Sequence, residues 1–144
     1  MRCVDVNVLV YAHREELPEH EHYLAWLERS RRHDEPLGLS DLVLSGFLRV
    51  VTHPRVFKDP TSLDTAVSFV DELRATPNVV RLAPADRHWR IFTRLCRDTD
   101  ARGNLVPDAY LAAMVIESGA TWYSDDRGFS RFAGLDWRHP LDTA

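Results

Sequence analysis

Short apolar runs recur along the chain and predict buried strands. The first lies within residues 1–10 and is rich in β-branched side chains, as is typical of a strand that is covered on both faces of a sheet. The later runs predict strands over 36–39, 78–82, 121–124 and around Trp137. Between these runs the apolar residues change to a helical period.

Helices are predicted wherever apolar residues recur at steps of three and four. Their ends carry the usual signals, such as Pro18 before the second helix, Pro54 after the third and Gly119 after the last. In chain order, the predicted helices are 7–14, 18–32, about 40–52 with Ser40 or Asp41 as its cap, 62–75, 85–98 and 104–118. Strands separated by helices predict one α/β domain over residues 1–144 with a mostly parallel sheet.

Size and composition agree with one soluble domain. The chain is 44% hydrophobic and 28% charged, and it is long enough to bury about two-thirds of its unfolded surface. No apolar stretch is long enough to span a bilayer, and no signal peptide precedes the first strand. Cys3 and Cys96 lack metal or redox spacing. We therefore expect a cytoplasmic protein with free thiols and no membrane contact.

The charged residues leave two interpretations open. The net charge of −4 does not itself indicate nucleic-acid binding, but seventeen of the eighteen basic residues are arginine and only Lys58 is lysine. Arginine makes planar, bidentate contacts with phosphate or carboxylate groups. This bias is therefore compatible with RNA or an acidic partner, and equally with genomic composition.

The helix predicted over 85–98 has two distinct sides. Its inward side is expected to carry Trp89, Phe92, Leu95 and Cys96. The opposite side forms a stripe of arginines, namely Arg87, Arg90, Arg94 and Arg97. Such a stripe is either a plain solvated face or a surface for RNA phosphates or a partner.

Asp5 interrupts the first apolar run, and Asn7 follows two residues later. A carboxylate inside a buried strand loses its hydration at a high cost in free energy unless a cation compensates it. We therefore expect the strand to end near Asp5 and to present its side chain at the carboxyl edge of the sheet, where open α/β sheets bind ligands. Alternatively, Asp5 or Asn7 only caps the helix that follows.

Two further aspartates occupy comparable places. Asp108 heads a stripe of small apolar residues that should pack a helix against the sheet, although it could serve only the helix dipole. Asp126 follows Ser124 at the end of a predicted strand, although 125–128 is also a good turn sequence. If the three acids converge, a cation must relieve their repulsion, and oxygen ligands suit Mg²⁺ or Mn²⁺. Such a site can polarise a phosphodiester and activate water.

Three segments resemble the acidic motifs of PIN-domain ribonucleases. They are Asp-Val-Asn-Val-Leu at 5–9, Val-Pro-Asp-Ala-Tyr-Leu-Ala-Ala at 106–113, and Ser-Asp-Asp-Arg-Gly-Phe at 124–129. The segments 48–57 and 129–141 are similar to parts of VapC-type toxins from bacterial toxin–antitoxin pairs. The similarity runs nearly end to end, in the order and spacing of the family.

The resemblance implies a three-layer α/β/α sandwich and an endoribonuclease that depends on Mg²⁺ or Mn²⁺. It implies that Asp5, Asp108 and Asp126 are the catalytic acids and metal ligands, and that Asn7 and Ser124 orient ligands or water. It also implies an RNA substrate, a homodimer and neutralisation by a cognate antitoxin. The antitoxin would bind as a helix in a groove, with Tyr11, Trp26 and Trp89 as candidate anchors or as plain core residues.

One position departs from the family pattern. The family usually carries a glutamate where this chain has Gly46. Glycine supplies no oxygen and costs a helix about 1 kcal/mol relative to alanine. Ser45 or Asp41 could substitute through water, although Asp41 is better explained as a cap. Without the glutamate we expect weaker metal binding, with one metal ion.

Two other functions are compatible with parts of the sequence. Gly46 is compatible with a PIN scaffold that has lost catalysis and binds RNA or a protein. The segment 5–9 also resembles haloacid-dehalogenase-type phosphatases, in which the first aspartate attacks phosphorus. Those enzymes need a downstream lysine, and Lys58 lies in a proline-rich loop, which makes the phosphatase the weaker hypothesis.

Overall fold

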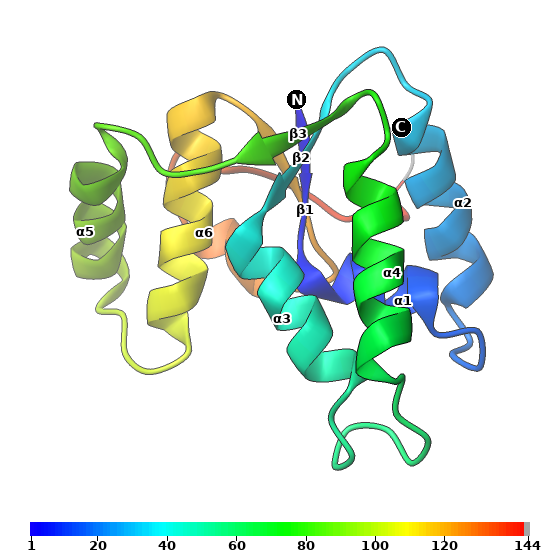
Figure 1. Ribbon diagram of the computed structural model, residues 1–144. Coiled ribbons are helices and arrows are strands. Elements are labelled where there is room, and N and C mark those ends of the chain that lie inside the picture. The colour runs from blue at the N-terminus through cyan, green and yellow to red at the C-terminus, as the bar shows by residue number, and fades with distance from the viewer. Residues whose placement is uncertain (143–144) are drawn as a thin grey trace.

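A single parallel sheet organises the protein. The computed structural model describes residues 1–142, and within them five strands follow the order β3-β2-β1-β4-β5 (Figure 1). The strands are β1 (Arg2–Val4), β2 (Leu37–Ser40), β3 (Val79–Leu82), β4 (Thr121–Tyr123) and β5 (Asp136–Arg138). Every neighbouring pair is parallel. The predicted α/β class is therefore confirmed, with β1 at the centre.

Helices cover both faces of this sheet. In the described part of the chain they are α1 (Val6–His13), α2 (His20–Arg31), α3 (Asp41–Val51), α4 (Leu63–Arg74), α5 (His88–Thr99) and α6 (Leu105–Ser118), with a 3₁₀ turn η1 (Arg127–Arg131). Figure 1 shows α5 and α6 on one side of the strands and α1, α2 and α4 on the other. The layers are those of the predicted α/β/α sandwich. None of the helices in residues 1–142 combines the length and apolarity needed to cross a bilayer.

Burial explains why these short segments hold together. All four residues of β2 are buried, and so are Cys3 and Val4 of β1, which places the strands between two layers of helices. The face of α6 that meets the sheet consists largely of small residues, including Ala109, Ala112 and Ala113, all fully buried. Small side chains let this helix approach the sheet closely.

Most of the predicted helix ends are found within one to three residues. Ser40, and not Asp41, caps α3, since its hydroxyl oxygen accepts a hydrogen bond from the Val43 amide at 3.1 Å. Gly119 ends α6 with a φ of 68°, in the left-handed region that favours glycine. Of the predicted domain 1–144, Thr143 and Ala144 lie outside the described residues.

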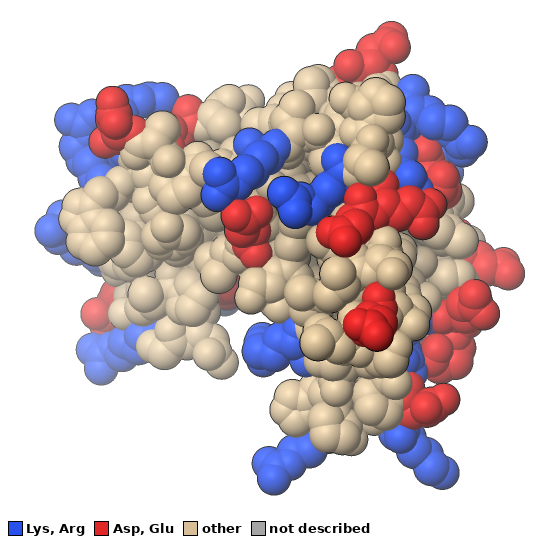
Figure 2. All heavy atoms as spheres, viewed as in Figure 1, with Lys and Arg blue, Asp and Glu red and all other residues tan. Residues whose placement is uncertain are grey.

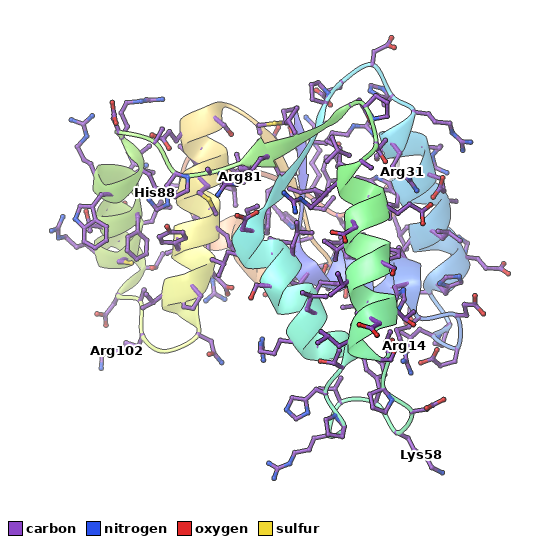
Figure 3. All side chains as sticks on the ribbon, viewed as in Figure 1. Arg14, Arg31, Lys58, Arg81, His88 and Arg102 are labelled. Carbon is purple, nitrogen blue, oxygen red and sulfur yellow. The ribbon has the colours of Figure 1, made fainter. Side chains whose placement is uncertain are left out.

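One predicted orientation is wrong. Trp89 was expected to face inward but is 68% exposed, because the buried side of α5 is centred on His88, Ile91 and Leu95. Figure 3 shows His88 between α5 and α6, where its Nε2 bonds the Tyr110 carbonyl at 3.0 Å. Figure 2 shows basic side chains along the outer edge of α5, so the predicted arginine stripe faces solvent.

The order of the strands creates a crevice beside β1. After β1 the chain adds β2 and β3 on one side, and it then returns to place β4 against the other side of β1. In register, Val4 of β1 pairs with Tyr123 of β4. Ligands of open parallel sheets bind at the carboxyl ends of the strands where the direction of growth reverses. The residues that follow Val4 and Tyr123 therefore meet at such a point.

Candidate metal centre

Asp5 and Ser124 meet at the carboxyl ends of β1 and β4. The backbone amide of Asp5 donates to the Tyr123 carbonyl at 3.0 Å, which extends the strand pairing by one residue. The Ser124 hydroxyl then donates to Oδ2 of Asp5 at 2.6 Å. Both side chains are buried. The predicted strand end at Asp5 is confirmed.

Asp5 is also the cap of α1. Its Oδ1 accepts a hydrogen bond from the Val6 amide at 2.7 Å, so the two predictions for this residue, strand end and helix cap, are both right. Burial raises the pKa of Asp5 above its usual value, and the nearby Asp126 carboxylate adds to the rise, whereas the hydrogen bonds from Ser124 and Val6 lower it. Within residues 1–142, Asp5 has no ion-pair partner closer than 4 Å. Hydrogen bonds from Ser124 and Val6, and not an ion pair within these residues, therefore stabilise its charged form.

Asn7 fixes the second oxygen of Asp5. Its side-chain oxygen accepts from the Asp125 backbone amide at 3.1 Å, so its NH₂ group faces the site. That NH₂ group donates to the Ser124 hydroxyl at 3.2 Å and lies 3.4 Å from Oδ2 of Asp5. Asn7 and Ser124 thus hold the Asp5 carboxylate in one orientation, in the positions that the resemblance implied for them.

Asp108 approaches the same region from the first turn of α6. The pKa of this carboxyl is raised from 3.8 to about 6, mainly by partial burial and then by the charges of Asp5 and Asp126, while the charge of Arg131 lowers it. Asp108 is therefore affected by the charges of Asp5 and Asp126, although it forms no hydrogen bond with either within residues 1–142.

Asp126 reaches the site from the turn after β4. Its amide donates to the Ser124 hydroxyl at 3.0 Å, and its Oδ1 accepts from the Gly128 amide at 2.8 Å, which caps η1. The turn interpretation of this residue is thus correct, and it does not compete with a role in the site. Its other oxygen accepts no hydrogen bond from residues 1–142 and is free to face a ligand.

The donor set suits a hard divalent cation. Over residues 1–142, no three acid, histidine or cysteine side chains already stand close enough to enclose a metal ion. Mg²⁺, however, keeps several of its waters and is typically bound through one or two carboxylates, so a closed cage of three is not required. A buried carboxylate with two acids nearby and no ion pair fits that chemistry.

Asp125, for which no separate role was predicted, is held by three side chains outside the group of acids. Its Oδ1 accepts hydrogen bonds from Tyr23 at 3.1 Å and His139 at 2.8 Å, and its Oδ2 accepts one from Tyr11 at 3.4 Å. The other ring nitrogen of His139 accepts from the Leu141 amide, so Nε2 carries the proton. With three donors around it, Asp125 serves as an anchor of the turn and not as a metal ligand. The sequence contains no signal of this network, because Tyr11 and Tyr23 lie about a hundred positions from Asp125.

The two candidate substitutes for the missing glutamate lie elsewhere. The Asp41 carboxylate pairs with Arg81, with Oδ2 at 2.9 Å from Nη2, and both side chains are exposed (Figure 3). Ser45 is exposed and, among residues 1–142, makes no side-chain hydrogen bond. Neither residue takes part in the hydrogen bonds that connect Asp5, Asn7, Ser124 and Asp126.

An apolar groove borders the acids. Asp5 and Asn7 form one end of it, and its volume is about 420 Å³. The rest of its lining is apolar or aromatic and comes from α1, α3 and the loops after them: Val6, Val10, Tyr11, Leu17, Val50, Val56 and Phe57. Val56 is 54% exposed, so this apolar surface is open to solvent.

The sequence and fold are similar to those of known proteins. The family model for the PIN domain matches residues 2–135, and the chain belongs to the PIN domain family. Ribonuclease VapC43 of Mycobacterium tuberculosis is 58% identical over 142 residues, which are 99% of this chain and 97% of that protein. Ribonuclease VapC25 of the same organism is 38% identical over 135 residues, 94% of this chain and 95% of that protein.

Solved structures agree on the fold. VapBC2 from Rickettsia felis, bound to a DNA fragment from its promoter, superposes with a TM-score of 0.71 at 18% identity, covering 96% of this chain and 97% of that one. VapC20 from Mycobacterium tuberculosis, described as a sarcin-ricin loop cleaving toxin, gives 0.63 at 18% identity, covering 94% and 98%. At these identities the likeness shows the fold alone.

Proposed function

We propose that this protein is an endoribonuclease that hydrolyses RNA phosphodiesters with Mg²⁺ or Mn²⁺, as the toxin of a toxin–antitoxin pair. The observation that carries the proposal is the buried Asp5 carboxylate, which has two acids nearby and no ion-pair partner within residues 1–142. The family and the ribonuclease relatives support it. We further propose that residues 1–144 act as a single PIN domain.

Each residue of the centre has a distinct task in this proposal. Asp5, Asp108 and Asp126 hold the divalent ion, directly or through water, and Asp126 also orients the attacking water. Asn7 and Ser124 keep the Asp5 carboxylate in place. A bound ion would supply Lewis-acid chemistry to the phosphodiester and to water. Hydrolysis would form a bond from the water oxygen to phosphorus and break one phosphorus–oxygen ester bond, and the leaving oxygen would take up a proton to become a hydroxyl.

The antitoxin is proposed to occupy the apolar groove beside Asp5. A helix with apolar residues at steps of three and four would cover Val10, Tyr11 and Phe57. Of the candidate anchors, Tyr11 lines this groove, whereas Trp26 is buried in the core and Trp89 lies on α5. The relatives solved as VapBC complexes support a partner of this kind.

A homodimer is the oligomer we propose, in agreement with an exposed apolar face on α3, α5 and α6. Leu42 is 45% exposed beside a groove lined by Phe92, Val106 and Tyr110, and the exposed Trp89 ring lies 5.4 Å from that of Phe92. Light scattering should give twice the chain mass, and Leu42→Arg should reduce it.

A metal titration with RNA tests the enzymatic proposal. Cleavage of a mixed RNA substrate should appear with Mg²⁺ or Mn²⁺ and disappear in EDTA. Asp5→Asn and Asp108→Asn should each lower kcat at least about a hundredfold, since a charged ligand is lost. Asp64→Asn, which changes an exposed acid at the start of α4, is the matched control.

The second candidate function is a PIN scaffold that binds RNA without cleaving it. Gly46, in place of the family's glutamate, favours this alternative. RNA retention by the wild type without any cleavage in Mn²⁺ would support it and refute the enzyme. The phosphatase hypothesis has no such support, because Lys58 lies at the exposed tip of the loop between α3 and α4 (Figure 3).

A further inference from the structure

The 3₁₀ turn after β4 carries two arginines in different surroundings. Arg127 pairs with Asp142 at 3.6 Å, and its guanidinium lies 5.8 Å from the centre of the Trp137 ring. Arg131, at the other end of the turn, makes no side-chain hydrogen bond or ion pair with any of residues 1–142, and it is exposed. Its five donors are therefore open to a ligand.

Gly128 places the Arg131 guanidinium beside the acidic site. A Cβ atom on Gly128 would lie 2.9 Å from Oδ1 of Asp126 and 3.0 Å from Nη2 of Arg131. The carboxylate and the guanidinium thus flank the same backbone position. Arg131 nevertheless stays more than 4 Å from every carboxylate oxygen of residues 1–142.

Arg131 lies beside Asp126 without pairing with it. Its guanidinium and the Asp126 carboxylate border the same point next to Gly128, but the two groups form no ion pair within 4 Å. An arginine that served only to balance their charge would be expected to form a close, bidentate pair with one of them.

A phosphate is the ligand that fits both the acids with a bound divalent ion and the Arg131 guanidinium. RNA bound to a divalent ion at the acids would bring a phosphate near Asp126, and the Arg131 guanidinium lies beside that residue. Arginine binds phosphate through two parallel hydrogen bonds, with more strength than a neutral donor. An additional cation is needed there, because a single divalent ion leaves three carboxylates and a phosphate only partly balanced.

We propose that Arg131 binds a phosphate of the RNA substrate at the metal centre, next to the bond that is cut. This inference rests on the proposed ribonuclease function and names a residue that contacts the substrate. Arg127, held by Asp142 and Trp137, faces a different environment and has no part in it.

Steady-state cleavage of a single-stranded RNA in saturating Mn²⁺ tests the proposal with three variants. Arg131→Gln should lower kcat/KM by about ten- to a hundredfold, as expected for the loss of a charge-assisted hydrogen bond. Arg131→Lys keeps the charge but not the planar fork, so it should recover part of the loss. Arg127→Gln, on the same turn, should remain within about twofold of the wild type.

Salt dependence separates substrate contact from a structural role. The slope of log kcat/KM against log KCl concentration should become shallower by about 0.7 in Arg131→Gln, which corresponds to one phosphate contact with a single strand. Mn²⁺ binding without RNA should be no weaker than in the wild type, because the substitution removes a cation from beside the acids. A general loss of structure would instead weaken metal binding and leave the slope unchanged.

The outcomes distinguish this inference from the proposed function. If the wild type cleaves RNA while Arg131→Gln keeps the wild-type kcat/KM and salt slope, Arg131 does not bind the substrate. If Arg131→Gln loses activity only together with Mn²⁺ affinity, its role is structural and the inference is equally wrong. A wild type that cleaves nothing in Mn²⁺ overturns the ribonuclease itself.

Discussion

Val6 occupies the space that a side chain on Gly46 would need. A Cβ atom built on Gly46 would lie 2.8 Å from Cγ2 of Val6, closer than such atoms come in real proteins. Val6 follows Asp5 directly, and Gly46 stands where the family usually has a glutamate. The packing of α1 against α3 therefore leaves no room for a glutamate side chain at position 46. Val6 fills the space next to the site that this side chain would occupy.

Gly46→Ala should destabilise the protein, although alanine favours helices. The gain of about 1 kcal/mol in helix propensity is outweighed by about 1–3 kcal/mol of overpacking against Val6. Urea unfolding of the wild type, Gly46→Ala, Val6→Ala and the double variant measures the coupling. The double variant should be more stable than the sum of the two single changes predicts by about 1 kcal/mol. Simple additivity would show that the contact is not energetically significant.

Restoring the fourth acid should require both changes. Val6→Ala with Gly46→Glu should bind Mn²⁺ roughly tenfold more tightly than Val6→Ala with Gly46→Gln, which has the same shape without the charge. Isothermal titration calorimetry at fixed pH gives both affinities. Equal affinities would mean that a glutamate at this position does not reach the metal.

Asp108 should make the metal-free protein less stable as the pH rises from about 4 to about 6. Its pKa is raised from 3.8 to about 6, so the folded state keeps a proton that the unfolded state has already lost. Above this range Asp108→Asn should be more stable than the wild type by about 1 kcal/mol, after allowance for solvent screening of a partly exposed group. The difference should vanish near pH 4.

Melting temperatures in EDTA across this pH range measure that effect. Mn²⁺ should reverse it, raising the melting temperature of the wild type more than that of Asp108→Asn, because only the wild type retains the full donor set. A difference between the two proteins that did not depend on pH would assign the effect to packing and not to charge.

Tyr23 and Tyr11 should contribute unequally to the anchoring of Asp125. Burial, with the charge of Asp125 next in size, raises the pKa of the Tyr23 hydroxyl, which therefore remains a donor at any pH at which the protein is folded. Tyr23→Phe should cost about 1–2 kcal/mol and Tyr11→Phe less, since the distances to Asp125 are 3.1 and 3.4 Å. Urea unfolding compares them; a larger loss for Tyr11→Phe would contradict this ranking.

The architecture could be predicted from the sequence because each strand or helix signal depends on residues close together in the chain. The apolar run around Asp5, the helix signals at Pro18 and Gly119, and the acid after Pro107 each depend on near neighbours. The ends of two parallel strands predicted Asp5 and Asp126 at one edge of the sheet, and the start of a helix predicted Asp108 nearby.

What escaped prediction depends on contacts between distant segments. His139 meets Asp125 only because β5 returns beside β4, and Val6 meets Gly46 only because α1 packs on α3. Neither pair has a spacing that a sequence pattern could reveal. The exposure of Trp89 was mispredicted for a related reason. The spacing of apolar residues shows that α5 has one apolar side, but only its packing against α6 decides which residues at the border of that side are buried.

The central place of β1, between strands from both ends of the chain, also sets when activity can begin. Ser124 follows Asp5 by 119 positions, so a growing polypeptide makes the first residue of the proposed centre long before the last ones. Until residues 121–126 have been made and have left the ribosome, Asp5 lacks both β4 and the hydrogen bond from Ser124. The proposed nuclease would therefore be inactive throughout the synthesis of residues 1–126.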